Sequence, residues 1–119
     1  MKQPILLAVV CIMQLHCLAQ KKNAVKYDFP AEMAAPIKEA YTLQCDKGKV
    51  LYEINCAKCH NTVISKKKST IPDFTQEQLS NYELRVKNPN HESAMPETVV
   101  TAEELGLIIT FLTYKEKNK

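Results

Sequence analysis

Three chemically reactive side chains fall within five residues of the chain, Cys56-Ala57-Lys58-Cys59-His60. On a helical turn, positions i and i+3 lie on one face, so the two thiols can reach neighbouring vinyl groups of one porphyrin and form thioethers. His60 comes next on that turn, and imidazole is a nitrogen ligand that suits iron. This spacing is typical of covalent haem attachment, and it predicts one haem c held by Cys56 and Cys59 with His60 as an iron ligand.

The N-terminus predicts export. Lys2 precedes a nearly uninterrupted apolar run from Ile5 to Met13, and the chain becomes polar from Gln20. The run is too short to cross a bilayer as a stable anchor. We therefore expect residues 1–19 to be a secretory signal peptide, a periplasmic location, and no transmembrane anchor in the mature chain.

A lipid anchor on Cys17 is a weaker interpretation of the same segment. Gln14 and His16 occupy positions where a lipoprotein signal usually has Leu and a small residue. The sequence thus favours an exported protein without a lipid.

Cys56, Cys59 and His60 also allow two other interpretations, a zinc site and a thiol redox pair. A zinc site needs four ligands, and Cys45 with His91 would complete the set. However, the spacing of these residues does not match a compact zinc finger, and structural zinc is less expected in an exported chain. A thioredoxin-like pair would lie at a strand-to-helix turn in a βαβ pattern, and the sequence around Cys56 indicates no such strand.

The segment after the signal peptide has 100 of the 119 residues, which is one small domain. Loss of Lys2 leaves 15 basic residues against 13 acidic ones, a net charge of +2 where the full chain has +3. Strong nucleic-acid binding would need a larger basic surplus on one face. With no Trp, three Phe and five Tyr the core is thin, so we expect poor folding without the porphyrin.

The apolar periodicity predicts helices throughout the mature chain. After a polar leader over Lys21–Phe29, a first helix follows Pro30 or begins at Pro36. A second helix is capped by Asp46 and runs into Cys56. Its predicted apolar side consists of Val50, Leu51 and Ile54.

Two more helices follow a loop over residues 66–73, which Pro72 favours. Thr75 with Gln78, and Thr101 with Glu104, make capping boxes at their starts. Their predicted apolar faces are Leu79, Tyr82 and Val86, then Leu105, Ile108, Ile109 and Leu112. Since no stretch shows sustained alternation of period two, the predicted fold class is all-α, a small helical domain packed around one covalent haem.

The order of motifs over most of Cys45 to Tyr114 resembles the mono-haem class I cytochrome c family. The matching segments are Asp46-Lys47-Gly48-Lys49-Val50-Leu51-Tyr52, the Cys56 to His60 motif, Met95-Pro96, and Ile109-Thr110-Phe111-Leu112. Residues 20–44 form an extension outside that resemblance, and residues 45–119 form the cytochrome c-like domain. Asn61 stands where Gly is frequent in the family.

The resemblance implies that Cys56 and Cys59 carry the thioethers, that His60 is the proximal iron ligand and that Met95 is the distal one. Pro96 would keep Met95 on an extended segment from which its thioether can reach the iron. A thioether opposite an imidazole raises the reduction potential. The resemblance also implies that the first and last helices cross, with Gly48 against Phe111 or Tyr114.

Other residues compete for these roles. Taken alone, Met95 would be a core filler. His91 is its rival as a ligand and would lower the potential, but we expect it to be a solvated loop residue, and Met33 ranks last. Cys45 is either buried or paired between chains.

The predicted function is that of an electron carrier, not an enzyme, in which iron cycles between two oxidation states for redox protein partners. Lys66-Lys67-Lys68, with Lys49 and Lys58, could form a basic rim that attracts an acidic docking face. The alternatives are a haem enzyme subunit or a gas or redox sensor with an open distal position, and a docking module whose haem only holds the fold.

Overall fold

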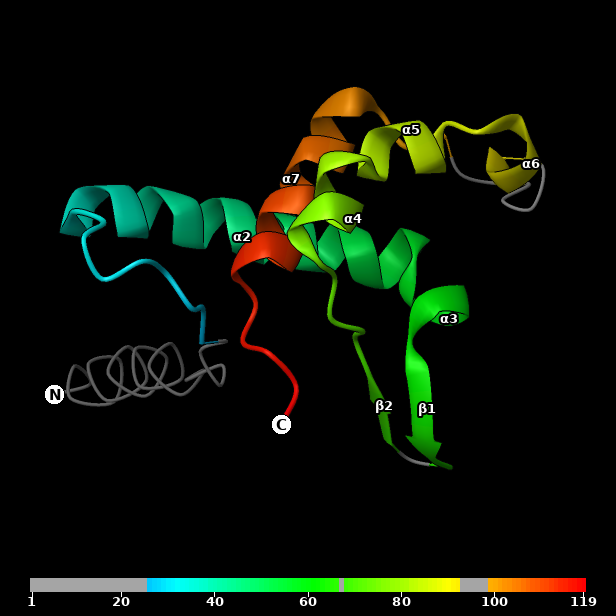
Figure 1. Ribbon diagram of the computed structural model, residues 1–119, viewed down its shortest axis with the longest axis horizontal. Helices are drawn as coiled ribbons and strands as arrows, with labels where there is room; N and C mark the ends of the chain where they lie inside the picture. The colour runs from blue at the N-terminus through cyan, green and yellow to red at the C-terminus, as the bar shows by residue number, and fades with distance from the viewer. Residues whose placement is uncertain (1–25, 67, 93–98) are drawn as a thin grey trace, which may run out of the picture.

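The computed structural model describes residues 26–66, 68–92 and 99–119 (Figure 1). In chain order the elements are α2 (Ala35–Asn55), α3 (Ala57–His60), β1 (Thr62–Ser65), β2 (Lys68–Thr70), α4 (Gln76–Ser80), α5 (Tyr82–Val86), α6 (Pro89–Glu92) and α7 (Ala102–Tyr114). None of the helices in these ranges is long and apolar enough to cross a membrane. The predicted signal peptide, residues 1–19, and Met95 lie outside the described residues.

Helix α2 is continuous through the region where two helices were predicted. Pro36 lies in its first turn, where a missing N–H costs nothing, and the helix then runs without interruption to Asn55. The prediction that Asp46 caps a second helix is wrong. Asp46 lies in mid-helix, and its Oδ1 accepts a hydrogen bond of 2.6 Å from the Tyr27 hydroxyl.

The buried face of α2 also differs from the predicted one. Cys45, Gly48 and Tyr52 are buried, whereas Val50 and Ile54 are 53% and 68% exposed. The predicted face was inferred from apolar residue types, but the close approach of the partner helix requires Gly48, which has no side chain, on the buried face.

Helix α7 begins as predicted, and three of the four residues of its predicted face, Leu105, Ile108 and Leu112, are buried, whereas Ile109 is half-buried. The Thr101 hydroxyl accepts a hydrogen bond from Glu104 N (3.2 Å), and the Glu104 carboxylate accepts one from Thr101 N (2.8 Å). Its buried side chains are Leu105, Ile108, Phe111 and Leu112. They join Tyr52, Leu79 and Tyr82 in one core.

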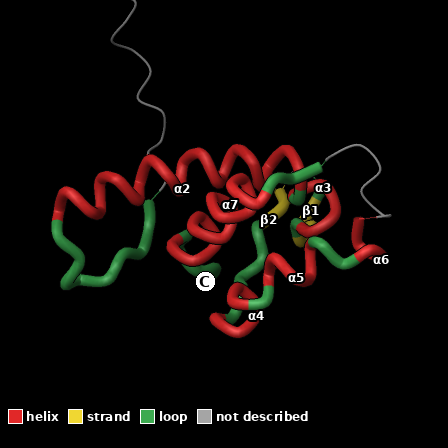
Figure 2. Tube along the Cα trace, turned by 90° about the horizontal axis from the view of Figure 1, so that it is seen from above, coloured by secondary structure: helices red, strands yellow, loops and turns green. Residues whose placement is uncertain are grey.

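Helices α2 and α7 cross at Gly48 (Figure 2). A Cβ atom built on Gly48 would overlap the Leu107 carbonyl oxygen and lie 2.9 Å from Phe111 Cβ. The close approach implied by the family resemblance is therefore present, with Phe111 as the aromatic at the crossing. Tyr114 instead packs against Tyr41, with ring centroids 5.4 Å apart.

The end of the predicted polar leader packs on the domain. Asp28 N donates a hydrogen bond of 2.7 Å to Tyr114 O. The Phe29 ring lies 5.0 Å from that of Tyr114, and Tyr27 lies 6.5 Å from Phe111. The prediction of a polar leader is thus wrong for Tyr27 and Phe29, because their aromatic rings pack on α7. The polar residues around this aromatic pair obscured it in the sequence.

A two-stranded antiparallel sheet corrects the all-α prediction. Strands β1 and β2 pair with Thr62 opposite Thr70 and Val63 opposite Ser69. The β-branched residues of these strands favour an extended backbone. Both strands are short and almost entirely exposed, so their sequences show no alternation of apolar and polar residues. The fold is therefore mixed: mainly helical, with a hairpin that projects from the helices (Figure 1).

The region after the hairpin forms two short helices where one was predicted. The capping box of Thr75 and Gln78 is present at the start of α4. The helix then breaks at Asn81, whose side-chain amide donates to Glu77 O (3.1 Å), and α5 begins at Tyr82. Leu79 and Tyr82 still reach the core as predicted.

An ion pair joins the C-terminal end of α7 to the segment before α4. The Lys115 side chain is 6% exposed, and its ammonium group donates to the Asp73 carboxylate. Asn118 N donates to the other oxygen of the same carboxylate (3.0 Å). This pairing holds Phe74 and the start of α4 against α7.

Candidate functional site

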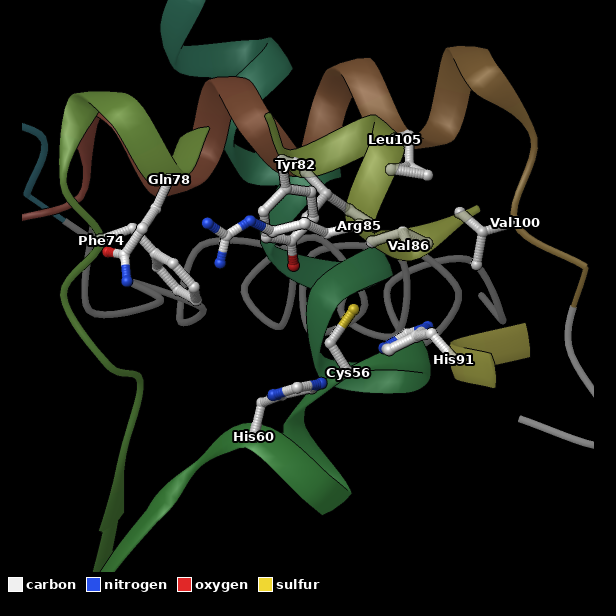
Figure 3. Close-up of a pocket in the computed structure, with 11 residues that line it drawn as sticks. Cys56, His60, Phe74, Gln78, Tyr82, Arg85, Val86, His91, Val100 and Leu105 are labelled. Carbon is white, nitrogen blue, oxygen red and sulfur yellow. The ribbon is translucent and has the colours of Figure 1, made fainter. Parts of the chain in front are cut away.

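A cavity of about 260 Å³ lies between α3, α4, α5, α6 and α7 (Figure 3). Its apolar walls are Phe74, Tyr82, Val86, Val100, Leu105 and Ile108, and its polar lining residues are Cys56, His60, Gln78, Arg85 and His91. Apolar walls with a few converging polar groups are typical of a ligand or cofactor site.

The Cys56 to His60 motif forms the helical turn that the sequence predicts. Cys56 closes α2 through a hydrogen bond from its N–H to Tyr52 O (2.8 Å), and its own carbonyl accepts from Cys59 N (3.2 Å) and His60 N (3.0 Å). Cys56 and His60 line the cavity. Cys59 is exposed on the same turn and is not among the residues that line the cavity.

The turn leaves α3 through Asn61 without strain. Asn61 has φ −69° and ψ 135°, an extended conformation open to any residue, so the glycine frequent at this position in the resembled family is not required. The Asn61 side-chain oxygen accepts a hydrogen bond of 3.1 Å from the Tyr52 hydroxyl. Since Tyr52 is fully buried, this bond ties the site to the core.

The Cys56 thiol lies in an apolar setting beside the Tyr82 hydroxyl. Burial raises the pKa of Cys56, and a hydrogen bond from Tyr82 acts in the opposite direction. Burial, with the nearby Cys56 sulfur, also raises the pKa of Tyr82. Cys45, Cys56 and Cys59 are all free thiols, so both motif cysteines remain available for covalent attachment.

His91 faces His60 in the cavity, which corrects the prediction that it is a solvated loop residue. The two ring centroids are 5.9 Å apart and the ring planes differ by 19°. His91 Nδ1 is buried and has no hydrogen-bond partner in the part of the chain that the structure describes. His91 belongs to the short helix α6, and its N–H donates to Asn88 O (2.9 Å).

Cys45 lies apart from the motif cysteines. Its side chain is fully buried at the crossing of α2 and α7, with Sγ 3.7 Å from Thr110 O. Burial raises the pKa of this thiol to about 11. Within residues 26–66, 68–92 and 99–119, no group of three or more His, Cys, Asp or Glu is arranged to hold a metal ion. The zinc set with Cys45 therefore does not assemble among these residues.

Several cavity residues were not singled out from the sequence as site residues. Arg85 and Gln78 supply polar side chains that reach over the cavity (Figure 3), and Phe74 supplies an apolar wall. Tyr82 was predicted only as core. Their place in the chain was one available signal. These residues lie between the Cys56 to His60 motif and the last helix, in the segment that would have to cover a group bound to the motif.

Comparison with models of known protein families finds no match, and neither the curated proteins nor the solved structures include a match to the chain. The interpretation of the site therefore depends on its own residues and geometry.

Proposed function

We propose that the chain is an exported mono-haem c-type cytochrome that carries single electrons between redox proteins. One observation carries the proposal: the Cys56-to-His60 turn presents a thiol and an imidazole to an apolar cavity, with the second thiol on the same turn. This is the donor set that covalent haem attachment requires. The family resemblance of the sequence points to the same cofactor.

The cavity residues suit a haem. Cys56 and Cys59 would hold it through thioethers, and His60 would bind its iron. The walls formed by Phe74, Val100, Leu105 and other apolar side chains match an apolar porphyrin plate. Arg85 and Gln78 are the polar groups that would donate hydrogen bonds to the haem carboxylates, since a guanidinium pairs well with a carboxylate.

The bound haem supplies a reversible one-electron couple between ferrous and ferric iron. The residues around it set the conditions for that couple. The apolar walls would exclude water, and His60 would bind the iron. By the family resemblance Met95 provides the second axial ligand, which would raise the potential. With both positions filled by protein ligands, substrate has no free coordination site.

A basic surface near the motif supports an acidic redox partner. From residue 54 to residue 72 the chain has no Asp or Glu. Lys58, Lys66 and Lys68 are exposed on α3 and the hairpin. Such a surface attracts an acidic docking face and speeds encounter at low salt. Lys49 belongs less to this surface because it pairs with Glu53 (3.1 Å).

The test is the intact mass and visible spectrum of the exported protein, made in a host able to attach haem covalently. We expect one haem per chain, loss of residues 1–19 and no lipid. Cys56→Ser and Cys59→Ser should each remove one thioether, and the double variant should lose covalent haem. Cys45→Ala is the matched control and should keep it. A colourless wild-type protein with the mass of its polypeptide alone would contradict the proposal.

A second measurement separates electron transfer from the alternatives. We expect fast, reversible reduction at an electrode and little carbon monoxide uptake by the ferrous protein. Ready carbon monoxide binding by the wild-type protein would instead support a sensor or haem enzyme with an open distal position.

A further inference from the structure

The outer face of α2 carries apolar side chains that do not belong to the core. Leu43, Val50 and Ile54 are 61%, 53% and 68% exposed. At about 3.6 residues per turn they fall on one face of the helix, roughly half a turn from the buried Gly48 and Tyr52. A surface helix normally has one apolar stripe, which faces the core. Helix α2 therefore has a second apolar stripe, directed to solvent.

The helices and strands that the structure describes leave this outer face uncovered. Among them only α7 and α3 contact α2, and α7 lies against Gly48 on the inner face. Figure 2 shows α2 along the upper edge of the molecule, with α7 beneath it. A contiguous exposed apolar surface marks an interaction site, whereas a single exposed apolar side chain does not. We therefore expect a polypeptide partner on the outer face.

The spacing on this face is that of a two-stranded coiled coil. Residues 43, 47, 50 and 54 follow one another at intervals of four, three and four, which is the d-a-d-a spacing of a heptad. Leucine at d with isoleucine at a favours two parallel helices, and a single lysine at an a position specifies the register and the number of chains. Together these residues form the outer row of α2: Leu43, Lys47, Val50 and Ile54. Such a row favours a second helix with the same pattern.

One flank of the outer row is acidic. Exposed carboxylates recur there at every seventh residue: Glu39, Asp46 and Glu53. Asp46 keeps its full charge, because the Tyr27 hydroxyl that donates to it is neutral. Glu53 pairs with Lys49 (3.1 Å), but a surface pair of this kind is weak and leaves the carboxylate accessible. Lys47 is exposed on the side of the row away from these carboxylates.

This charge pattern selects the direction in which a second copy can bind. In an antiparallel pair of copies the two acidic flanks would face each other, and like charges across a contact repel. In a parallel pair the acidic flank of each copy faces the lysine side of the other, so Lys47 of one copy lies beside Asp46 of the second copy. The outer row is therefore complementary to itself in the parallel direction.

We propose that two copies of the chain associate through the outer row, with their α2 helices side by side and pointing the same way. The pair has a two-fold axis parallel to α2, the commonest symmetry of protein oligomers. Because α7 packs on the inner face of each α2, the two domains lie on opposite sides of the contact. Association requires no new helix, since α2 is already formed in the single copy.

The contact has two consequences for the dimer. It covers only two heptads, so the dimer is weak and depends on concentration. It also involves no residue of the cavity, so the inference goes beyond the proposed function and does not require the haem.

The test is sedimentation of the exported, haem-loaded protein at micromolar to millimolar concentrations. We expect a reversible equilibrium between monomer and dimer. Val50→Lys should raise the dissociation constant of the dimer by roughly tenfold or more, because it places an ammonium group in the apolar row of each copy. Val63→Lys is the matched control. Val63 is 75% exposed on β1, so the same change of charge there should leave the dissociation constant unchanged.

Exchange of two charges tests the direction of the pair. Lys47→Glu should weaken the dimer, because it brings acidic groups together across the contact. Asp46→Lys combined with Lys47→Glu should restore association, since each ammonium group again faces a carboxylate.

A cross-link gives a second measure of direction. Residues with the same number at a d position lie opposite each other in a parallel pair, so Leu43→Cys should form a disulfide between copies under mild oxidation. Val63→Cys provides an exposed thiol on the hairpin and should not form one.

Three results would overturn the inference. A protein that stays monomeric at millimolar concentration would leave the outer row to a helix of another polypeptide. A dimer that neither Val50→Lys nor Lys47→Glu weakens would have its contact elsewhere. A dimer in which Leu43→Cys forms no cross-link would not be parallel. Because sedimentation measures association with or without bound haem, a monomer with covalent haem leaves the proposed function intact, and a colourless protein that dimerises contradicts the proposed function alone.

Discussion

Gly48 on α2 lies directly against the carbonyl oxygen of Leu107 on α7, with no space for a side chain between them. The crossing of the two longest helices depends on this contact.

Gly48→Ala should therefore destabilise the protein, although alanine is the better helix former. Overpacking typically costs about 1–3 kcal/mol, more than the gain of about 1 kcal/mol in helix propensity. Urea unfolding of the loaded protein measures the change. Gly106→Ala is the matched control, because nothing lies within 4 Å of its Cβ, and it should stabilise α7. Equal effects of the two substitutions would show that the crossing is looser than described.

Asp73→Asn should lower the free energy of unfolding by about 1–3 kcal/mol, because it leaves the buried Lys115 ammonium without its counter-ion. Lys115→Met should cost less, since it removes the buried charge itself and leaves only the partly exposed carboxylate.

The same pair predicts a pH dependence. Burial opposes ionisation of Asp73, but the hydrogen bond from Lys115 and the one from Asn118 N outweigh it and lower the pKa of Asp73 below 3.8. Its contribution is therefore complete above pH 3.8 and is lost as pH falls through the lower, folded-state pKa. Unfolding measured against pH should show this acid loss in the wild type, and Asp73→Asn should reduce it.

Cys45 should resist alkylation in the folded protein. Burial raises the pKa of its thiol from 9.0 to about 11, so at pH 8 it is protonated as well as covered. Iodoacetamide should label it only after denaturation, as mass spectrometry would show. Because the pKa of Cys45 is higher in the folded state, the stability that comes from burying the neutral thiol is complete below pH 9. That stability is lost as pH rises through about 11. Rapid labelling of the native protein at pH 8 would place the thiol at the surface.

Replacing Lys58, Lys66 and Lys68 together by Glu should slow electron transfer to an acidic redox protein by roughly tenfold or more at low salt, and high salt should remove the difference. Stopped-flow rates at several ionic strengths test this. A matched control changes Lys38, Lys47 and Lys87, which gives the same net charge with the substitutions on α2 and at the end of α5 instead of on α3 and the hairpin. If both triple variants slow the reaction equally, only net charge matters and no docking surface exists.

The elements best predicted from the sequence are those with local signals. The capping boxes at Thr75 and Thr101 depend on residues three apart, and the Cys56 to His60 turn depends on five consecutive residues. The Gly48 contact followed from the family resemblance, because a glycine inside a helix needs a reason.

What the sequence did not reveal depends on distant contacts. The hairpin at Thr62–Thr70 is exposed on both strands, so it leaves no alternating pattern. The inward position of His91 depends on α6 meeting α3 across the cavity, which no local pattern records. Pro36 suggested a break in a region that is one helix, because its position within the first turn decides its effect.

Under the proposed function, the chain order of the cavity residues would set a sequence of events during export. The motif cysteines precede Val100, Leu105 and Ile108, which close the cavity from α7 and the segment before it. A chain that emerges N-terminus first therefore presents its thiols in the open, before the last wall exists. Attachment machinery would reach them at that stage, and the arrival of the C-terminal helix would then enclose the attached group.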